Sequence, residues 1–340
     1  MSTRIACARS GSRRLMVEIS KRNARTWSRM GIRAIYGQAL AGYAAENPNV
    51  IAVSADLGRS SGLDRFSKEY PNQFINTGIA EQNMVGVAAG LARSGFDVFA
   101  STFAPFASMR ASEQVRMNMG YMGEPVKLVA LGSGFAMGLL GNSHYGLEDL
   151  AVMRAIPGLT IVSPADCAEI YKTLEACIGH RKPVYIRLTG GVNCPIVYEE
   201  DYDFQLGKAV WIKPAADITL VSAGTTVGHC RSAADALAGE GFTIGVLNMH
   251  TIKPLDKEAL AHAAAVSCTL IVVEEHMRTG GLGSAVLEFF AEVGAPRCRI
   301  VTYGIPDRYG ETGTYPYMLK TSGLDADGIA RLIKRETANA

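Results

Sequence analysis

The sequence predicts an α/β fold of two domains, each a mainly parallel sheet with helices on both faces. The chain has 340 residues of which 48% are hydrophobic, enough for one large core or two ordinary ones. Short apolar runs alternate with segments of helical periodicity, which is typical of parallel βαβ units. A polar, less periodic passage at residues 193–205 separates two such halves.

The first half predicts helices and strands in regular alternation. Its helices, recognised by apolar residues at helical spacing, are expected at residues 34–46, 81–94, 108–121 and 165–179. Its strands, short apolar runs, are expected at residues 50–54, 98–102, 126–131, 159–162 and 184–187. Since consecutive strands are joined by helices, we expect them to lie parallel in one sheet.

The second half repeats this arrangement. Buried strands are expected at residues 218–222, 244–248, 269–274 and 300–303. Helices are expected at residues 227–240, 257–265, 283–293 and 325–334. We therefore divide the chain into a basic N-terminal extension (1–30), a first domain (31–192), a linker (193–205) and a second domain (206–340).

The charge is distributed unevenly. Residues 1–30 carry a net charge of +7, whereas the chain as a whole carries +2. A basic start of this kind is found in transit-like segments, in nucleic-acid-binding arms and in ordinary surface extensions. We favour the surface extension, because no apolar segment follows it and the rest of the chain is not basic. Nucleic acid is not an expected partner.

Cysteine usage and hydropathy predict a cytoplasmic protein. The seven cysteines are odd in number, scattered, and never spaced as CxxC, so neither a disulfide framework nor a zinc site is indicated. The longest apolar stretch, residues 126–141, is short for a bilayer span and contains several glycines. We expect no membrane segment.

An acidic residue, Glu81, stands at the start of the helix predicted at residues 81–94. An isolated glutamate at such a position is most often a solvated acid favoured by the helix dipole. The same helix carries a face of small residues, Gly86, Ala89 and Gly90, although each glycine costs roughly 1 kcal/mol of helix propensity. Such a face permits close approach of another helix or subunit.

Three motifs place Glu81 in a recognisable context. GIAEQNM (78–84), STFAPF (101–106) and GNSHYG (141–146), in this order and spacing, resemble the pyrimidine-binding domain of transketolase and deoxyxylulose-phosphate synthase, which are thiamine diphosphate enzymes. SADLG (54–58) and RAIPGLTIVSPAD (154–166) extend the resemblance. The second half is similar to the transketolase C-terminal domain, so the resemblance runs from about residue 31 to the C-terminus.

The resemblance implies two catalytic residues. Glu81 matches the glutamate that hydrogen-bonds N1′ of the cofactor's aminopyrimidine and so favours the imino tautomer whose 4′-nitrogen removes the thiazolium C2 proton. His144 aligns with a histidine that contacts substrate oxygen and assists proton transfer. A histidine in a glycine-flanked loop suits acid/base work, although a lone histidine is more often structural.

The resemblance also implies residues that hold the cofactor. Phe103 and Phe106 match the aromatic residues that contact the aminopyrimidine by stacking and apolar packing. Asp56 and Ile79 fall in segments that border the cofactor in relatives. Met109 stands where transketolase often has a third aromatic residue.

The implied substrate site is only partly kept. Arg33 and Ser60 match positions that bind the phosphate of a sugar phosphate. Arg187 is the candidate to replace a phosphate-binding arginine that is missing three residues later. Three positions that hold an aspartate, a histidine and that arginine in the family are changed here: Leu140, Gly132 and Gly190. We therefore expect a sugar or sugar-phosphate substrate that is not a standard pentose phosphate.

Half of the expected cofactor site is missing. Thiamine diphosphate enzymes bind the diphosphate through Mg²⁺ with a G-D-G motif, and this sequence contains no Gly-Asp pair. We expect a separate α subunit to carry that motif, the diphosphate and the Mg²⁺, in an α₂β₂ assembly with no metal ligands from this chain. The sequence is thus interpreted as the β subunit of a split transketolase.

Two alternatives remain open. The β subunit of a 2-oxoacid dehydrogenase E1 component shares the layout, but its equivalents of STFAPF and GNSHYG differ. A catalytically silent scaffold or regulatory subunit would also keep the fold, although it would have no need to retain Glu81, Phe103, Phe106 and His144. The glycines of EEHMRTGGLGSAV (274–286) lack the order of a nucleotide loop, so we expect no catalytic role there.

Overall fold

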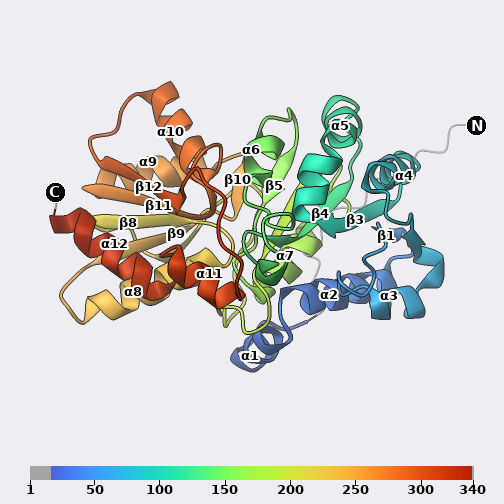
Figure 1. Ribbon diagram of the computed structural model, residues 1–340, viewed down its shortest axis with the longest axis horizontal. Coiled ribbons are helices and arrows are strands. Elements are labelled where there is room, and N and C mark those ends of the chain that lie inside the picture. Colours follow the sequence, from blue (N-terminus) through green and yellow to red (C-terminus); the bar gives the residue numbers. More distant parts are fainter. Residues whose placement is uncertain (1–16, 339–340) are drawn as a thin grey trace, which may run out of the picture.

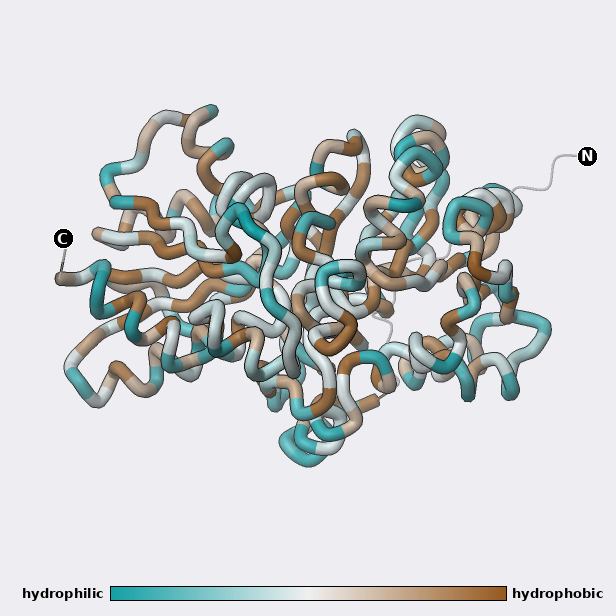
Figure 2. Tube along the Cα trace, in the orientation of Figure 1, coloured by the Kyte–Doolittle hydropathy of each residue, from teal (hydrophilic) through white to brown (hydrophobic). Residues whose placement is uncertain are grey.

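The computed structural model describes residues 17–338, so residues 1–16 of the expected basic extension lie outside the described residues. Two α/β lobes lie side by side, the first containing the blue-to-green part of the chain and the second the yellow-to-red part (Figure 1). Hydrophobic residues concentrate on the strands inside both lobes (Figure 2). Within residues 17–338, no helix has the length and apolar character needed to span a bilayer.

The first lobe contains a sheet of seven strands. Their bounds are β1 Val50–Ser54, β2 Phe74–Asn76, β3 Asp97–Phe103, β4 Lys127–Ser133, β5 Thr160–Val162, β6 Val184–Thr189 and β10 Thr251–Lys253. Their order in space is β10-β5-β6-β4-β3-β1-β2, and all neighbours are parallel except the β10–β5 pair. The central strands are buried on both faces, as their continuous apolar runs predict.

Helices cover both faces of this sheet, as expected. The α-helices of the first lobe are α1 Lys21–Met30, α2 Ile32–Glu46, α3 Asp64–Glu69, α4 Glu81–Arg93, α5 Ser112–Gln114, α6 Asp149–Arg154 and α7 Cys167–Cys177, with short 3₁₀ turns at Pro71–Gln73 and Gly138–Leu140. α2 and α7 contribute to one hydrophobic core cluster and α4 to another, and successive residues of β1 alternate between the two clusters.

The helix expected at residues 108–121 is irregular. Two π-helical segments, Phe106–Arg110 and Val115–Tyr121, flank the short α5. Side-chain bonds to the preceding turn accompany the distortion, since the Ser108 hydroxyl donates to the Ala104 carbonyl at 2.7 Å. The π turn begins three residues after β3 ends, and π turns are frequent at functional sites.

The second lobe is built on a five-stranded sheet. Its strands are β7 Val210–Lys213, β8 Ile218–Ser222, β9 Ile244–Asn248, β11 Thr269–Met277 and β12 Arg299–Ile305, in the order β12-β11-β8-β9-β7. All neighbours are parallel except β7 and β9. The helices are α8 Thr226–Ala238, α9 Lys257–Val266, α10 Leu282–Val293, α11 Tyr315–Thr321 and α12 Ala326–Ala338. α8 and α12 lie on one side of the sheet, α9 and α10 on the other (Figure 1).

Two features tie the segments together more closely than the sequence indicated. β10 follows β9 of the second lobe but adds to the first sheet, antiparallel to β5. Residues 21–30, placed in the extension by their charge, form α1, whose Trp27 is buried with its ring 4.8 Å from that of Tyr171. Residues 193–205, the expected linker, contain no regular element.

Candidate active site

The candidate site lies at the carboxyl ends of the parallel strands of the first sheet, where open α/β sheets bind ligands. Phe103 is the last residue of β3, Asp56 follows β1 by two residues, and the loop with His144 follows β4. α4 begins at Glu81, shortly after β2 ends at Asn76. Parallel pairing therefore brings residues from distant parts of the sequence to one edge.

Glu81 is a buried acid with one charged partner. It is the first residue of α4 and is 3% exposed. The Nη1 atom of Arg110 donates a hydrogen bond to its Oε1 at 2.8 Å, while the Arg110 side chain remains 46% exposed. A buried carboxylate needs such a partner, because desolvating an unpaired charge is costly. Arg110 did not figure in the sequence analysis, because the expected helix began at residue 108; in the structure Phe106 and Arg110 are the first and last residues of one π-helical segment.

Aromatic rings lie beside this acid. The ring centroids of Phe103 and Phe106 are 6.1 Å apart, and the His144 ring lies 6.0 Å from the first and 5.3 Å from the second, edge-on to both. The guanidinium carbon of Arg110 lies 3.9 Å from the centroid of Phe106. Direct ring contacts, and the contact that Arg110 shares with the acid and a ring, thus bring together Glu81, Phe103, Phe106 and His144.

The loop that carries His144 is held by the second lobe. Asn142 and Gly310 exchange two hydrogen bonds, of 2.9 Å and 3.2 Å, and the Tyr145 hydroxyl donates to the Glu311 carbonyl at 2.8 Å. The Ser143 hydroxyl lies 3.0 Å from Nδ1 of His144. The position of the histidine therefore depends on both lobes.

Asp56 and Ile79 lie at the exposed rim. Asp56 adopts a left-handed backbone conformation (φ 58°), and its carboxylate accepts a hydrogen bond from the Asn76 amide at 3.1 Å. Ile79 is 79% exposed although it is apolar and lies two residues from the buried Glu81. Other exposed apolar side chains flank site residues in sequence: Met109, Leu139, Leu140 and Val192.

A basic cavity lies at the same edge of the sheet. It has a volume of about 390 Å³ and is lined by Arg33, Arg59 and Ser60, together with the 191–192 loop after β6. Arg33 Nη1 donates to the Ser60 carbonyl at 3.1 Å. Among residues 17–338, no carboxylate pairs with either arginine in a salt bridge. The cavity suits an anion, and Arg59 is a cation that the sequence analysis had not selected.

Arg187 does not line this cavity. It is 3% exposed, its Nε donates to both carboxylate oxygens of Asp149 at 2.9 Å and 3.1 Å, and its Nη2 donates to the carbonyls of Gly146 and Glu275. A substrate phosphate would have to displace a buried ion pair to reach it. Its position therefore argues against the substrate-binding role expected from the sequence and favours a role in joining the two lobes.

Two of the three altered family positions, Gly132 and Gly190, have little room for a side chain. Gly132 and Gly190 have φ angles of 65° and 85°, which disfavour any side chain. A Cβ atom at Gly132 would lie 2.6 Å from Met137 Cγ, and one at Gly190 would lie 2.8 Å from Thr225 Cγ2. A larger residue at either position would therefore need both a rare backbone conformation and movement of its neighbours.

Buried acids lie where the lobes meet. Burial raises the pKa of Glu274 and of Glu275 to about 7. Glu274 accepts hydrogen bonds from the first two amides of α10, at Leu282 and Gly283, and so caps that helix. These contacts fix the start of α10 against β11.

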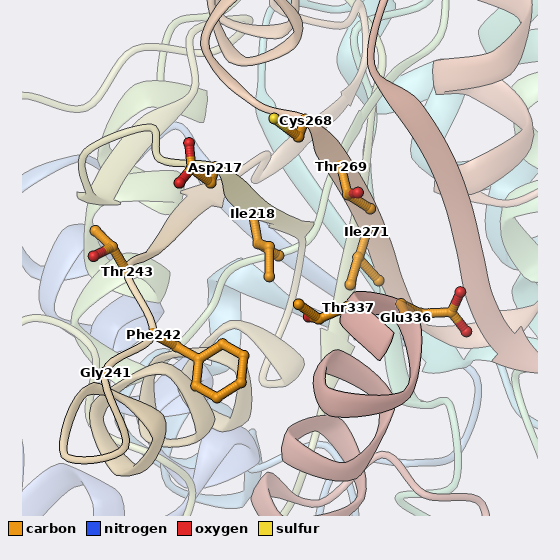
Figure 3. A pocket seen from close by; sticks show the side chains of 10 residues that line it. All are labelled: Asp217, Ile218, Gly241, Phe242, Thr243, Cys268, Thr269, Ile271, Glu336 and Thr337. Atoms are coloured by element: carbon orange, nitrogen blue, oxygen red, sulfur yellow. The ribbon is translucent and has the colours of Figure 1, made fainter. Parts of the chain in front are cut away.

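A separate cavity of about 250 Å³ lies at the amino ends of β8, β9 and β11 (Figure 3). Cys268 and Asp217 lie at its rim, and its Glu336 is paired with Arg299 at 2.6 Å. This cavity is at the opposite end of the strands from the ligand-binding edge of an open sheet. Within residues 17–338, no group of three His, Cys, Asp or Glu side chains is arranged to hold a metal ion.

Comparison with known proteins identifies the family of both domains. Residues 28–192 match the family model of the transketolase pyrimidine binding domain, and residues 207–329 that of the transketolase C-terminal domain. The 6-deoxy-6-sulfo-D-fructose transketolase subunit of Clostridium sp. strain MSTE9 is 38% identical over 300 residues, covering 88% of this chain and 92% of that protein. One of the subunits of the apulose-4-phosphate transketolase of Phocaeicola vulgatus is 40% identical over 289 residues, covering 85% and 91%.

A solved structure shows the same likeness. It is described as a split gene transketolase in the form of an inactive β4 tetramer, and it superposes with a TM-score of 0.80 at 37% identity. The match covers 90% of this chain and 97% of that one.

Proposed function

Because this chain belongs to the transketolase family, we propose that it is the β subunit of a split, thiamine diphosphate-dependent transketolase. The enzyme transfers a two-carbon ketol unit from a ketose or ketose phosphate to an aldehyde. The observation that carries the proposal is the buried Glu81 at the start of α4, beside the Phe103–Phe106–His144 ring cluster. A scaffold subunit would have no need for a desolvated carboxylate beside an aromatic cluster.

The residues present fit the aminopyrimidine half of the cofactor. The planar guanidinium of Arg110 hydrogen-bonds Glu81 and lies against the face of Phe106, which shows that a flat hydrogen-bond donor is accommodated between the acid and the ring. Glu81 would hold a proton at N1′ of the pyrimidine, and Phe103 and Phe106 would keep water from its faces. Thiamine diphosphate, when bound, supplies the thiazolium carbon that accepts the ketol unit.

The diphosphate and Mg²⁺ are assigned to a separate α subunit with a G-D-G motif. The exposed Ile79 and the exposed Asp56 border the cofactor in this arrangement, and the partner would cover the apolar side chain of Ile79. We infer an α₂β₂ assembly, since two-fold symmetry closes most soluble oligomers. The relative described as an inactive β4 tetramer supports the view that β subunits alone lack activity.

His144 is assigned to proton transfer at a substrate oxygen. Its ring is partly exposed, it lies edge-on to Phe106, and its loop is fixed by Asn142 and Tyr145 against the second lobe. Fixed placement of an acid/base group near the reacting atoms is a main source of its catalytic effect. The second domain thus contributes to catalysis by holding this loop.

The substrate is inferred to be anionic and non-standard. Arg33 and Ser60 are kept and lie in the basic cavity, to which Arg59 adds a second guanidinium. Gly132 and Gly190 leave out two polar groups that the family uses for ketose phosphates. Relatives of this chain are named for 6-deoxy-6-sulfo-D-fructose and apulose-4-phosphate, neither of which is a standard donor.

We place the protein in the cytoplasm, because all six cysteines within residues 17–338 are free. The transketolase assignment is preferred to the β subunit of a 2-oxoacid dehydrogenase E1 component, since the two relatives compared above, each matched over more than 90% of its own length, are described as transketolase subunits.

The proposal is tested by co-expressing the chain with its candidate G-D-G partner, adding thiamine diphosphate and Mg²⁺, and screening ketose donors by mass spectrometry. We expect ketol transfer from the complex and none from either subunit alone. Transfer of an acyl group from a 2-oxoacid, or a complex inactive with every ketose while it binds the cofactor, would contradict the proposal.

A further inference from the structure

The side chain of Arg110 bridges two residues of the candidate site. Its Nη1 donates to Glu81 Oε1 at 2.8 Å, and its guanidinium carbon lies 3.9 Å from the centroid of the Phe106 ring. At this separation a planar cation makes a cation–π contact with the ring. The guanidinium of Arg110 therefore pairs with the buried acid and also covers the face of the aromatic ring.

These are the two contacts that the aminopyrimidine of thiamine diphosphate would make in the proposed function: a hydrogen bond to Glu81 and packing against Phe106. We propose that Arg110 takes the place of the aminopyrimidine while no cofactor is bound, and that its side chain must turn away before the ring enters. The inference rests on the proposed function and concerns how this chain controls access to its own half of the cofactor site.

The surroundings of Arg110 allow this movement. Its side chain is 46% exposed, whereas that of Glu81 is 4% exposed, so the arginine has a path to water and the acid does not. Within residues 17–338, the guanidinium of Arg110 hydrogen-bonds no side chain other than Glu81. The neighbouring Met109 is also exposed. One ion pair and one ring contact hold the guanidinium, and both are reversible.

Arg110 stabilises the buried carboxylate of Glu81 but lowers the affinity of the site for the cofactor. Without Arg110, the carboxylate of Glu81 would be buried and unpaired in the cofactor-free chain, which is unfavourable. With it, only the fraction of molecules whose arginine has turned away is competent to bind, and the apparent dissociation constant rises by the inverse of that fraction. For a half-exposed ion pair with a cation–π contact, we expect an effect of about three- to tenfold.

The test measures the affinity of the reconstituted complex with its partner subunit for thiamine diphosphate, by calorimetry in the presence of Mg²⁺. The variants are Arg110→Ala, which removes both contacts, and Arg110→Lys, which keeps the charge but cannot lie flat on the ring. Arg116→Ala is the matched control, because it also removes one positive charge. Arg116 lies six residues further on and pairs with Glu113 on the surface.

We expect Arg110→Ala to lower the dissociation constant about three- to tenfold, Arg110→Lys to lower it less, and Arg116→Ala to leave it unchanged. The tighter binding of Arg110→Ala should come from a larger association rate constant, with the dissociation rate constant unchanged. Equal or weaker binding by both Arg110 variants, with the control at the wild-type value, would overturn this inference alone. Absence of binding by the wild-type complex would overturn the proposed function together with it.

Discussion

The Nε atom of Arg187, on β6, lies 2.9 Å from Oδ2 of Asp149 at the start of α6, and both side chains are buried. Arg187 Nη2 also donates to the carbonyl of Glu275 on β11 of the second lobe at 2.9 Å. The pair thus links the edge of the first sheet that forms the candidate site to the second domain.

Removing Arg187 is expected to destabilise the protein rather than to change substrate affinity. Arg187→Met leaves the Asp149 carboxylate buried without its charge partner, a change that costs about 3–5 kcal/mol. The urea midpoint of unfolding should fall clearly. Arg116→Ala, which breaks an exposed pair, should lower the free energy of unfolding by no more than about 1 kcal/mol. An unchanged midpoint together with a raised KM for phosphorylated donors would restore the role expected from the sequence.

The isolated chain is expected to retain no thiamine diphosphate, because in the proposed function it would contact the aminopyrimidine half only. Calorimetry of the purified chain with cofactor and Mg²⁺ should show no tight binding, and binding should appear when the α subunit is added. A chelator should remove the cofactor from the complex, because in the proposed function the partner would need Mg²⁺ to hold the diphosphate. Tight, Mg²⁺-dependent binding by this chain alone would contradict the division of the site.

Glu81→Gln is expected to abolish turnover in a complex that still assembles. Glutamine nearly preserves the volume of the side chain but cannot share a proton with N1′ in the same way. Hydrogen/deuterium exchange at C2 of the bound cofactor is the direct measurement, and it should slow by at least about 100-fold. Size-exclusion chromatography supplies the control for assembly. A wild-type exchange rate in the variant would remove Glu81 from the mechanism.

His276 is expected to make the chain less stable in acid. Its Nε2 accepts a hydrogen bond from the Leu150 amide at 3.1 Å, and burial lowers its pKa to about 4. Because the folded pKa lies below the unfolded value of 6.5, its contribution to stability is complete above pH 6.5 and is lost as the pH falls through 4. The effect is roughly 1.4 kcal/mol for each unit of pKa difference.

The measurement must separate His276 from the acids near it, whose raised pKa values act in the opposite sense. We therefore compare the thermal midpoints of the wild type and His276→Gln from pH 7 to pH 4, with the exposed His262→Gln as control. The difference in thermal midpoint between the wild type and His276→Gln should shrink as the pH falls. The difference between the wild type and His262→Gln should stay constant. A gap that widens in acid would show that the imidazole is charged in the folded protein.

Local patterns predicted most elements of the fold but not the contacts between distant segments. The bounds of β1 and β8 agree with their apolar runs, because continuous burial determines both. The pairing of β10 with β5 depends on a strand of one lobe reaching the sheet of the other, and a three-residue strand has no pattern of its own. Long elements could therefore be predicted, and short pairing segments could not.

The candidate site shows the same limit. The family motifs identified Glu81 and His144, whose grouping at one edge follows from parallel strands. They did not reveal that Arg110 pairs with Glu81 across 29 residues. Arg187 was assigned to substrate from its sequence position three residues before Gly190. Gly190 lies beyond the end of β6, whereas the side chain of Arg187 leaves that strand buried and is directed into the domain junction.

The basic cavity lined by Arg33 and Arg59 is expected to bind the anionic group of the substrate. Arg33→Ala and Arg59→Ala should each raise KM for an anionic donor by about 10- to 150-fold if the guanidinium forms a charged hydrogen bond of about 1.5–3 kcal/mol with it. Neither change should affect an uncharged ketose to the same extent. Arg116→Ala again serves as the control, and higher salt should weaken binding of the anionic donor in the wild type.

The three altered family positions, which lie outside the basic cavity, should discriminate against standard donors. Leu140, Gly132 and Gly190 remove polar groups with which the family binds ordinary ketose phosphates, and the positive φ angles and close neighbours of both glycines prevent the lost side chains from being restored by substitution alone. Gly132→His should therefore destabilise the protein without improving use of xylulose 5-phosphate. If the wild-type complex used xylulose 5-phosphate with a kcat/KM on the order of 10⁶ M⁻¹s⁻¹, typical of good enzymes, the inferred change of substrate would be wrong. A donor with altered length, branching or substitution that reaches this efficiency, and loses it in Arg33→Ala, is the expected result.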